Sequence, residues 1–175
     1  MKDDSAAATL RARARALARP PVEAPTDGTT MRLLEFRLAQ EHYAVETRHV
    51  REVILLSNLT QVPCTPPFVV GIVNVRGHIL PVLDLMALLG LPTPLLIDLH
   101  YVVVVGGPDI EFGLLVDVIV GVRSVPSETV QSPPPALTGT HGNYLTGVAG
   151  ERLAVLDVAR ILADPRIIVD EEVET

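Results

Sequence analysis

The chain has 175 residues, of which 48% are apolar and 3% aromatic, and its formal net charge is −7. This length allows one ordinary domain with a sizeable core built mainly of Val, Leu and Ile. The acidic balance and the scarcity of aromatic rings argue against nucleic acid as a partner, because such partners need stacking platforms or a basic face. We expect no direct membrane insertion, since no apolar run reaches the roughly 18 residues of a spanning helix. The lone Cys64 and the lack of a secretory signal favour a cytoplasmic protein.

The two ends differ in composition from the middle of the chain. Residues 1–30 are rich in Ala, Arg, Pro and Thr, and we expect a disordered N-terminal tail there. Residues 166–175 read as an acidic C-terminal tail. The folded domain is therefore expected over residues 31–165.

Short strands are predicted through the first half of that domain. From Met31 apolar and polar residues alternate with the period of a strand, and a polar connection at 39–42 leads to a second strand around 43–45. Residues 50–56 read as a third strand. Two further strands meet at a turn formed by Arg76 and Gly77, which predicts a hairpin.

The stretch 71–85 is repeated 73 residues later, at 144–158. Its apolar frame is kept, but Asn74 and Arg76 become Gly147 and Ala149. A duplicated framework with one decorated copy suggests that the fold needs both halves while the function uses one. Each copy ends on an aspartate that can cap a short helix, namely Asp84 and Asp157.

These patterns predict an all-β fold of two small barrels of about five strands each, with short capping helices and a shared apolar seam. The first barrel is expected over about 31–92 and the second over about 98–163, with the option that their ends are exchanged. A parallel α/β sheet is excluded because no helical pattern of ten or more residues separates the strands.

Catalytic and metal-binding constellations are not evident in the sequence. The histidines do not fall at metal-ligand spacing, and there is no nucleophile elbow or phosphate-binding loop, so we expect no metal, no cofactor and no catalysis. Asp84 and Asp157 could in principle form an acid/base dyad, but the apolar residues after each favour helix capping. A small-molecule site in the apolar seam is a second alternative, which requires polar groups pointing into the seam.

Arg76 is the best candidate for partner binding. Its guanidinium can recognise a carboxylate or backbone carbonyls in a fork geometry, although an ordinary exposed turn arginine is the alternative. Alternation along residues 50–53 places Val50 and Glu52 on the same face of a strand. This face could bind a partner helix, or it could simply be exposed to solvent. With Val73 and Asn74 these residues make up the candidate partner-binding surface of the first barrel.

Several of these segments together resemble the CheW family of chemotaxis coupling proteins, over about residues 33–163. The points of likeness are Tyr43-Ala44-Val45, Val50-Arg51-Glu52-Val53, Thr65-Pro66-Pro67-Phe68-Val69-Val70-Gly71, Asn74-Val75-Arg76-Gly77, Ile79-Leu80-Pro81-Val82-Leu83-Asp84-Leu85 and Tyr144-Leu145-Thr146-Gly147. The resemblance implies two SH3-like five-stranded barrels and an adaptor without catalysis or cofactor. It further implies two partners, the cytoplasmic tip of methyl-accepting chemoreceptors and the regulatory domain of a CheA-type histidine kinase. In the family, the positions of Val50, Glu52 and Arg76 are associated with these contacts.

Overall fold

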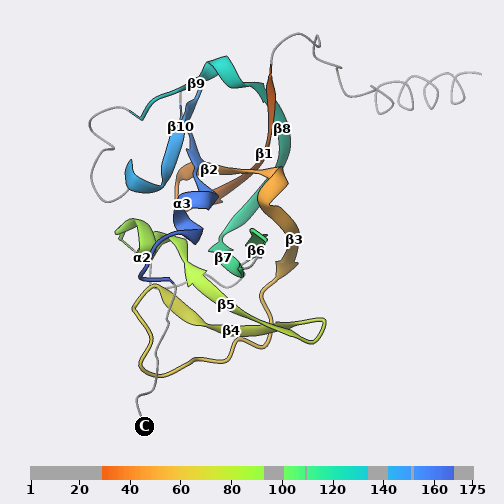
Figure 1. Cartoon of the computed structure of the whole chain (residues 1–175), viewed down its shortest axis with the longest axis vertical. Helices are drawn as coiled ribbons and strands as arrows, with labels where there is room; N and C mark the ends of the chain where they lie inside the picture. Colours follow the sequence, from red (N-terminus) through yellow and green to blue (C-terminus); the bar gives the residue numbers. More distant parts are fainter. Residues whose placement is uncertain (1–28, 93–100, 109, 134–141, 151, 168–175) are drawn as a thin grey trace, which may run out of the picture.

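The computed structural model describes residues 29–92, 101–108, 110–133, 142–150 and 152–167. Within them the chain forms two β-sheets, each curled into a small barrel, with short helices between and beside them (Figure 1). The predicted all-β class is confirmed.

The first sheet, called here the A barrel, has the strand order β8-β1-β2-β11-β10-β9. Its strands are β1 (Thr30–Leu38), β2 (Glu41–Glu46), β8 (Val118–Pro126), β9 (Val130–Gln131), β10 (Leu145–Ala149) and β11 (Leu153–Leu156). Three short 3-10 turns are also present: η1 (Thr47–His49) precedes β3, η2 (Ser127–Thr129) precedes β9, and η4 (Gly142–Tyr144) precedes β10.

The second sheet, called the B barrel, has the order β3-β6-β7-β5-β4. Its strands are β3 (Val50–Leu55), β4 (Val69–Val75), β5 (His78–Asp84), β6 (Tyr101–Gly106) and β7 (Glu111–Val116). The two orders correspond strand by strand, with β3, β6, β7, β5 and β4 in the places of β8, β1, β2, β11 and β10. The duplication seen in the sequence is therefore also a duplication of topology.

The pairing takes the second option for barrels at about 31–92 and 98–163, in which their ends are exchanged. Strand β2 lies parallel to β11, with Ala44 opposite Val155, and β5 lies parallel to β7, with Leu83 opposite Leu114. Each barrel thus takes its first hairpin from one half of the chain and its remaining strands from the other. A parallel pair needs a long crossover connection, and the exchanged half supplies it.

Three apolar clusters form the core. One fills the A barrel and another fills the B barrel. The largest cluster lies between the barrels and contains residues of both, including the fully buried Phe36 from β1 and Phe112 from β7. The expected shared seam is present and is filled by side chains.

Two short helices cap the barrels, and both begin at the predicted aspartates. In α2 (Leu85–Leu89) the Asp84 carboxylate accepts hydrogen bonds from the backbone N–H groups of Met86 and Ala87, at 2.8 and 3.1 Å. In α3 (Val158–Leu162) the Asp157 carboxylate accepts from the Arg160 N–H at 3.0 Å. Capping is confirmed over the acid/base dyad, because each carboxylate is engaged by its own helix.

The folded part of the chain extends slightly into both segments that were expected to be tails. Strand β1 already begins at Thr30. At the other end, Ile167 packs against the central cluster and Arg166 contacts two aromatic rings, so the folded part continues past 165. The rest of the predicted tails, residues 1–28 and 168–175, lies outside the described residues. Most of the Pro-rich loop, at 134–141, does too.

Candidate functional site

The turn predicted at Arg76 and Gly77 joins β4 to β5 and projects from the B barrel. Both residues have positive φ, 51° and 91°, as a two-residue hairpin turn requires. The Asn74 side-chain oxygen accepts a hydrogen bond from the Gly77 N–H at 2.8 Å. Asn74 therefore holds the turn in shape, and Gly77 supplies the conformational freedom.

Arg76 and Glu52, both candidate residues, come together in an ion pair. The Arg76 Nη2 lies 3.0 Å from Glu52 Oε2, and the two side chains are 81% and 27% exposed. The pair ties the hairpin tip to β3. Because solvent screens so exposed a pair, it contributes at most about 1 kcal/mol to stability. The guanidinium keeps further donors on its exposed side.

Strand β3 presents a different row outward from the one expected. The exposed residues are Arg51, Val53 and Leu55, while Val50 packs partly against the central cluster. Alternation predicts which residues share a face, but not which face is outside. Glu52 belongs to the half-buried row with Val50.

Val73 is a correction to the candidate surface. Its side chain is 3% exposed and belongs to the core of the B barrel. It points inward from β4, opposite to the exposed Asn74. A partner cannot contact this side chain in the folded protein, so its role is packing.

Exposed apolar side chains form two groups that the sequence did not predict. On the B barrel they are Val53 and Leu55 on β3, Ile79 on β5, which is 67% exposed, and Ile110 before β7. On the A barrel they are Val118, Val120 and Val122, a row along β8. Strands β3 and β8 occupy the same end position in the two sheet orders. Each barrel thus carries an exposed apolar row at its corresponding edge, a feature typical of protein-protein contacts.

The β8 row is held in place by a buried carboxylate. Glu35 on β1 is 8% exposed and bonds to His42 of β2 at 2.7 Å and to Arg123 of β8 at 3.1 Å. Burial raises the pKa of Glu35, but the hydrogen bonds from His42 and Arg123 outweigh it and leave the pKa below its ordinary value. The ionised carboxylate joins three neighbouring strands and fixes β8 to the sheet.

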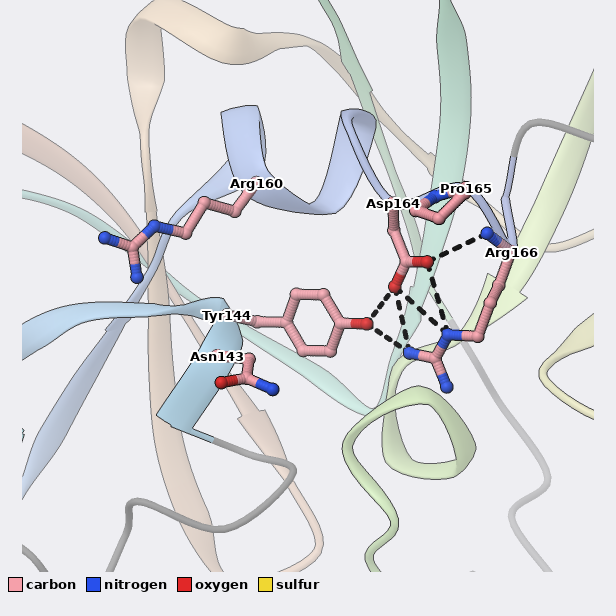
Figure 2. Close-up of a pocket in the computed structure, with 6 residues that line it drawn as sticks. All are labelled: Asn143, Tyr144, Arg160, Asp164, Pro165 and Arg166. Atoms are coloured by element: carbon pink, nitrogen blue, oxygen red, sulfur yellow. Dashed lines mark hydrogen bonds and ion pairs between the residues drawn. The ribbon is translucent and has the colours of Figure 1, made fainter.

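A pocket of about 400 Å³ lies beside α3. The residues around it are Asn143, Tyr144, Arg160, Asp164, Pro165 and Arg166 (Figure 2). Both arginines already have a carboxylate partner, since Arg166 pairs with Asp164 of the pocket at 2.9 Å and Arg160 pairs with Asp157 outside it at 3.1 Å. Sequence reasoning missed this cluster because Arg166 stands at the start of an acidic segment.

In the part of the chain that the structure describes, no three His, Cys, Asp or Glu side chains lie close enough to hold a metal ion. The same part contains no helix long and apolar enough to cross a membrane.

Comparison with known proteins identifies the family. The family model described as "CheW-like domain" matches residues 32–166. The chain belongs to the CheW-like domain family.

Two related proteins and one solved structure agree with this assignment. The chemotaxis protein CheW of Treponema pallidum is 30% identical over 142 residues, which cover 77% of this CheW-like chain and 84% of the relative. Protein PilI of Pseudomonas aeruginosa is 32% identical over 113 residues, covering 65% of this chain and 64% of the relative. The crystal structure of the scaffolding protein TtCheW from Thermoanaerobacter tengcongensis superposes with a TM-score of 0.67 at 26% identity, covering 79% of this chain and 89% of that one. Family and structure together make the chain a CheW-like scaffold protein of chemotaxis-type signalling.

Proposed function

We propose that this protein is a non-catalytic, cytoplasmic adaptor that couples the cytoplasmic tip of chemoreceptors to a CheA-type histidine kinase, without a cofactor. The observation that carries the proposal is the exposed Arg76 turn, which presents a guanidinium tied to Glu52 on a barrel that also exposes Val53, Leu55 and Ile79. A cation next to apolar side chains suits an amphipathic helix that offers a carboxylate and apolar residues.

The backbone at Arg76 supports a role in binding. A residue with a side chain costs about 1 kcal/mol or more in the left-handed conformation found there, at a φ of 51°. The ion pair with Glu52 is too exposed to offset much of this cost. The residue 73 positions after Arg76, Ala149, is not a turn residue in the structure. It lies in β10, is buried and pairs with Leu153, as the buried Val73 pairs with Leu80. The left-handed conformation is the one that the two-residue turn requires, and the Arg76 side chain at this tip is exposed to a partner.

The kinase is assigned to the second exposed row. Val118, Val120 and Val122 on β8 lie on the A barrel, whereas Arg76 lies on the B barrel. Two separate surfaces allow one adaptor to hold two partners at once. Each contact is small, but several linked contacts raise the effective concentration, so an array can assemble tightly from weak pairs.

A pull-down with a receptor cytoplasmic fragment and the kinase tests the site. Arg76→Glu and Glu52→Arg should each reduce receptor capture by about tenfold or more, the scale of a lost charge-assisted contact. The unfolding midpoint should change little, because the pair is exposed. The double variant, which restores an ion pair of reversed polarity, should stay folded and still bind poorly.

Arg48→Glu is the matched control. Arg48 is also an exposed arginine paired with a glutamate, Glu46, at 2.7 Å, but it lies on η1 rather than on the hairpin. It should keep wild-type capture. Full capture by both Arg76→Glu and Glu52→Arg would refute the site. The small-molecule alternative gains no support in the described residues, because side chains fill the seam.

A further inference from the structure

Phe68 and Tyr144, two aromatic residues of the cluster between the barrels, stand at the start of corresponding strands. Phe68 precedes β4 of the B barrel, and its carbonyl accepts a hydrogen bond from the Asp84 N–H at 2.7 Å. Tyr144 precedes β10 of the A barrel, and its carbonyl accepts from the Asp157 N–H, also at 2.7 Å. The two rings are thus equivalent under the internal duplication, and both are buried.

The Arg166 guanidinium contacts both rings. Its Cζ lies 5.7 Å from the centroid of Phe68 and 6.0 Å from that of Tyr144, within the range of cation-π attraction. One side chain therefore bridges the two barrels.

Asp164 holds this guanidinium in place. It accepts from Arg166 Nη2 at 2.9 Å and from Nε at 3.2 Å, and its carboxylate also accepts the Arg166 backbone N–H at 2.9 Å. The Tyr144 hydroxyl donates to Asp164 and accepts from Arg166 (Figure 2). The Arg166 guanidinium and the Tyr144 ring are each held by several hydrogen bonds, and such bonds are favourable only in a narrow range of orientations.

The cluster stays charged across the physiological range. The Arg166 hydrogen bonds hold the pKa of Asp164 at about 2, and the Asp164 hydrogen bond raises the pKa of Arg166. The position 73 residues before Asp164 is Leu91, which cannot pair with a guanidinium. The sequence repeat therefore does not reproduce this carboxylate in the first half.

We propose that Arg166, held by Asp164, is a positioning residue that fixes the orientation of the A barrel relative to the B barrel, and so couples the partner bound on one to the partner bound on the other. The second clause rests on the proposed function. The apolar cluster holds the two barrels together through the hydrophobic effect, which does not favour one orientation of the barrels over another. Packed elements of this kind can slide past each other by shear. Arg166 supplies the directional contact, through which a change at one surface reaches the other.

The orientation is measured directly by pulsed electron paramagnetic resonance on the full chain. Spin labels are placed at His78→Cys on β5 and Ser124→Cys on β8, both exposed, after the exposed Cys64 is changed to Ser. In Arg166→Met, which keeps the length of the side chain, the distance between labels should shift or broaden on the order of 2 Å. Arg166→Lys keeps the positive charge but loses the planar guanidinium, and its change in the distance between labels should lie between those of wild type and Arg166→Met.

Arg160→Met is the control, since Arg160 also borders the pocket but points away from the cluster in Figure 2. It should leave the distance distribution unchanged. An unchanged distribution in both Arg166 variants, with a normal unfolding transition, would overturn the positioning role. If Arg166→Met does not fold, Arg166→Lys decides the outcome.

The coupling is measured in the same variants. Arg166→Met should bind the receptor fragment and the kinase separately within about threefold of wild type, since neither surface includes it, while receptor-dependent stimulation of the kinase falls at least tenfold, within the usual range of coupling energies. Intact stimulation despite a shifted distance would overturn the role in coupling. A wild-type protein that binds neither partner would refute the proposed function instead, and the distance result would still judge the positioning role.

Discussion

Replacing Asp164 by Asn should lower stability at neutral pH and do so less in acid. Asn keeps the shape of the side chain and can still accept the Arg166 backbone N–H, but it removes the negative charge that Arg166 pairs with. A fall in the pKa of Asp164 from its ordinary value of 3.8 to about 2 corresponds to about 2 kcal/mol at pH 7. Because Arg166 is half exposed, solvent screening reduces this to about 1–2 kcal/mol.

The sign of the pH dependence follows from the lowered pKa. Stability from a carboxylate whose pKa is lower in the folded state is complete above pH 3.8, the unfolded value, and is lost as the pH falls toward about 2. The Asp164→Asn variant should therefore melt about 3–6 °C below wild type at pH 7. At pH 3 about half of that difference should remain. Scanning calorimetry suits this measurement, because the chain has no tryptophan. An equal deficit at both pH values would refute the electrostatic origin and leave only a packing effect.

Three further changes have definite expected outcomes. Asp84→Ala removes the cap of α2 and should reduce the free energy of unfolding by about 1 kcal/mol in urea titrations; no change would mean that the cap is dispensable. Gly147→Ala places a Cβ 2.4 Å from the Gln131 carbonyl oxygen and should cost about 1–3 kcal/mol, whereas Gly107→Ala meets nothing closer than 3.4 Å and should be nearly neutral; equal effects would contradict the steric reading. Val120→Lys on the exposed β8 row should leave the melting temperature unchanged and weaken kinase binding at least tenfold by surface plasmon resonance; unaltered binding would remove β8 from the kinase surface.

Local features were predictable from the sequence because short-range chemistry specifies them. The helix caps at Asp84 and Asp157 and the turn at Arg76 each depend on a few adjacent residues, and the structure has all three. The duplication was also visible, since it leaves a repeated string of apolar residues. These signals were enough to predict the class of fold and its two barrels.

The choice between exchanged and unexchanged strands could not be made from such patterns. Strands β2 and β11 pair in parallel although residues 44 and 155 are far apart in the chain, and only the completed barrels decide which hairpin fits which sheet. The pattern of buried and exposed residues within each half would be the same with or without exchange.

The candidate site was predicted in part. Arg76 and Glu52 lie together on the surface, but Val73 is buried and Val50 faces inward. The alternation of side chains along a strand shows which residues share a face, but tertiary packing decides which of the two faces is exposed. On β8 nearly every residue from Val118 to Val122 is apolar, so periodicity carried no information there. Arg166 was missed because its partners, Phe68 and Tyr144, come from distant segments.

The crossed strands bear on how such a molecule could arise. A chain holding only one of the two repeats would lack the hairpin that completes its own barrel, since that hairpin is contributed by the other repeat. Two identical single-repeat chains could supply it to each other as a swapped homodimer, and joining their genes in tandem would yield the connectivity seen here. An ancestor of this kind would have been symmetric, with the same surface on each copy. Once the copies shared one gene, each could acquire its own specialisation, as the arginine on one repeat and the bridging cluster on the other illustrate.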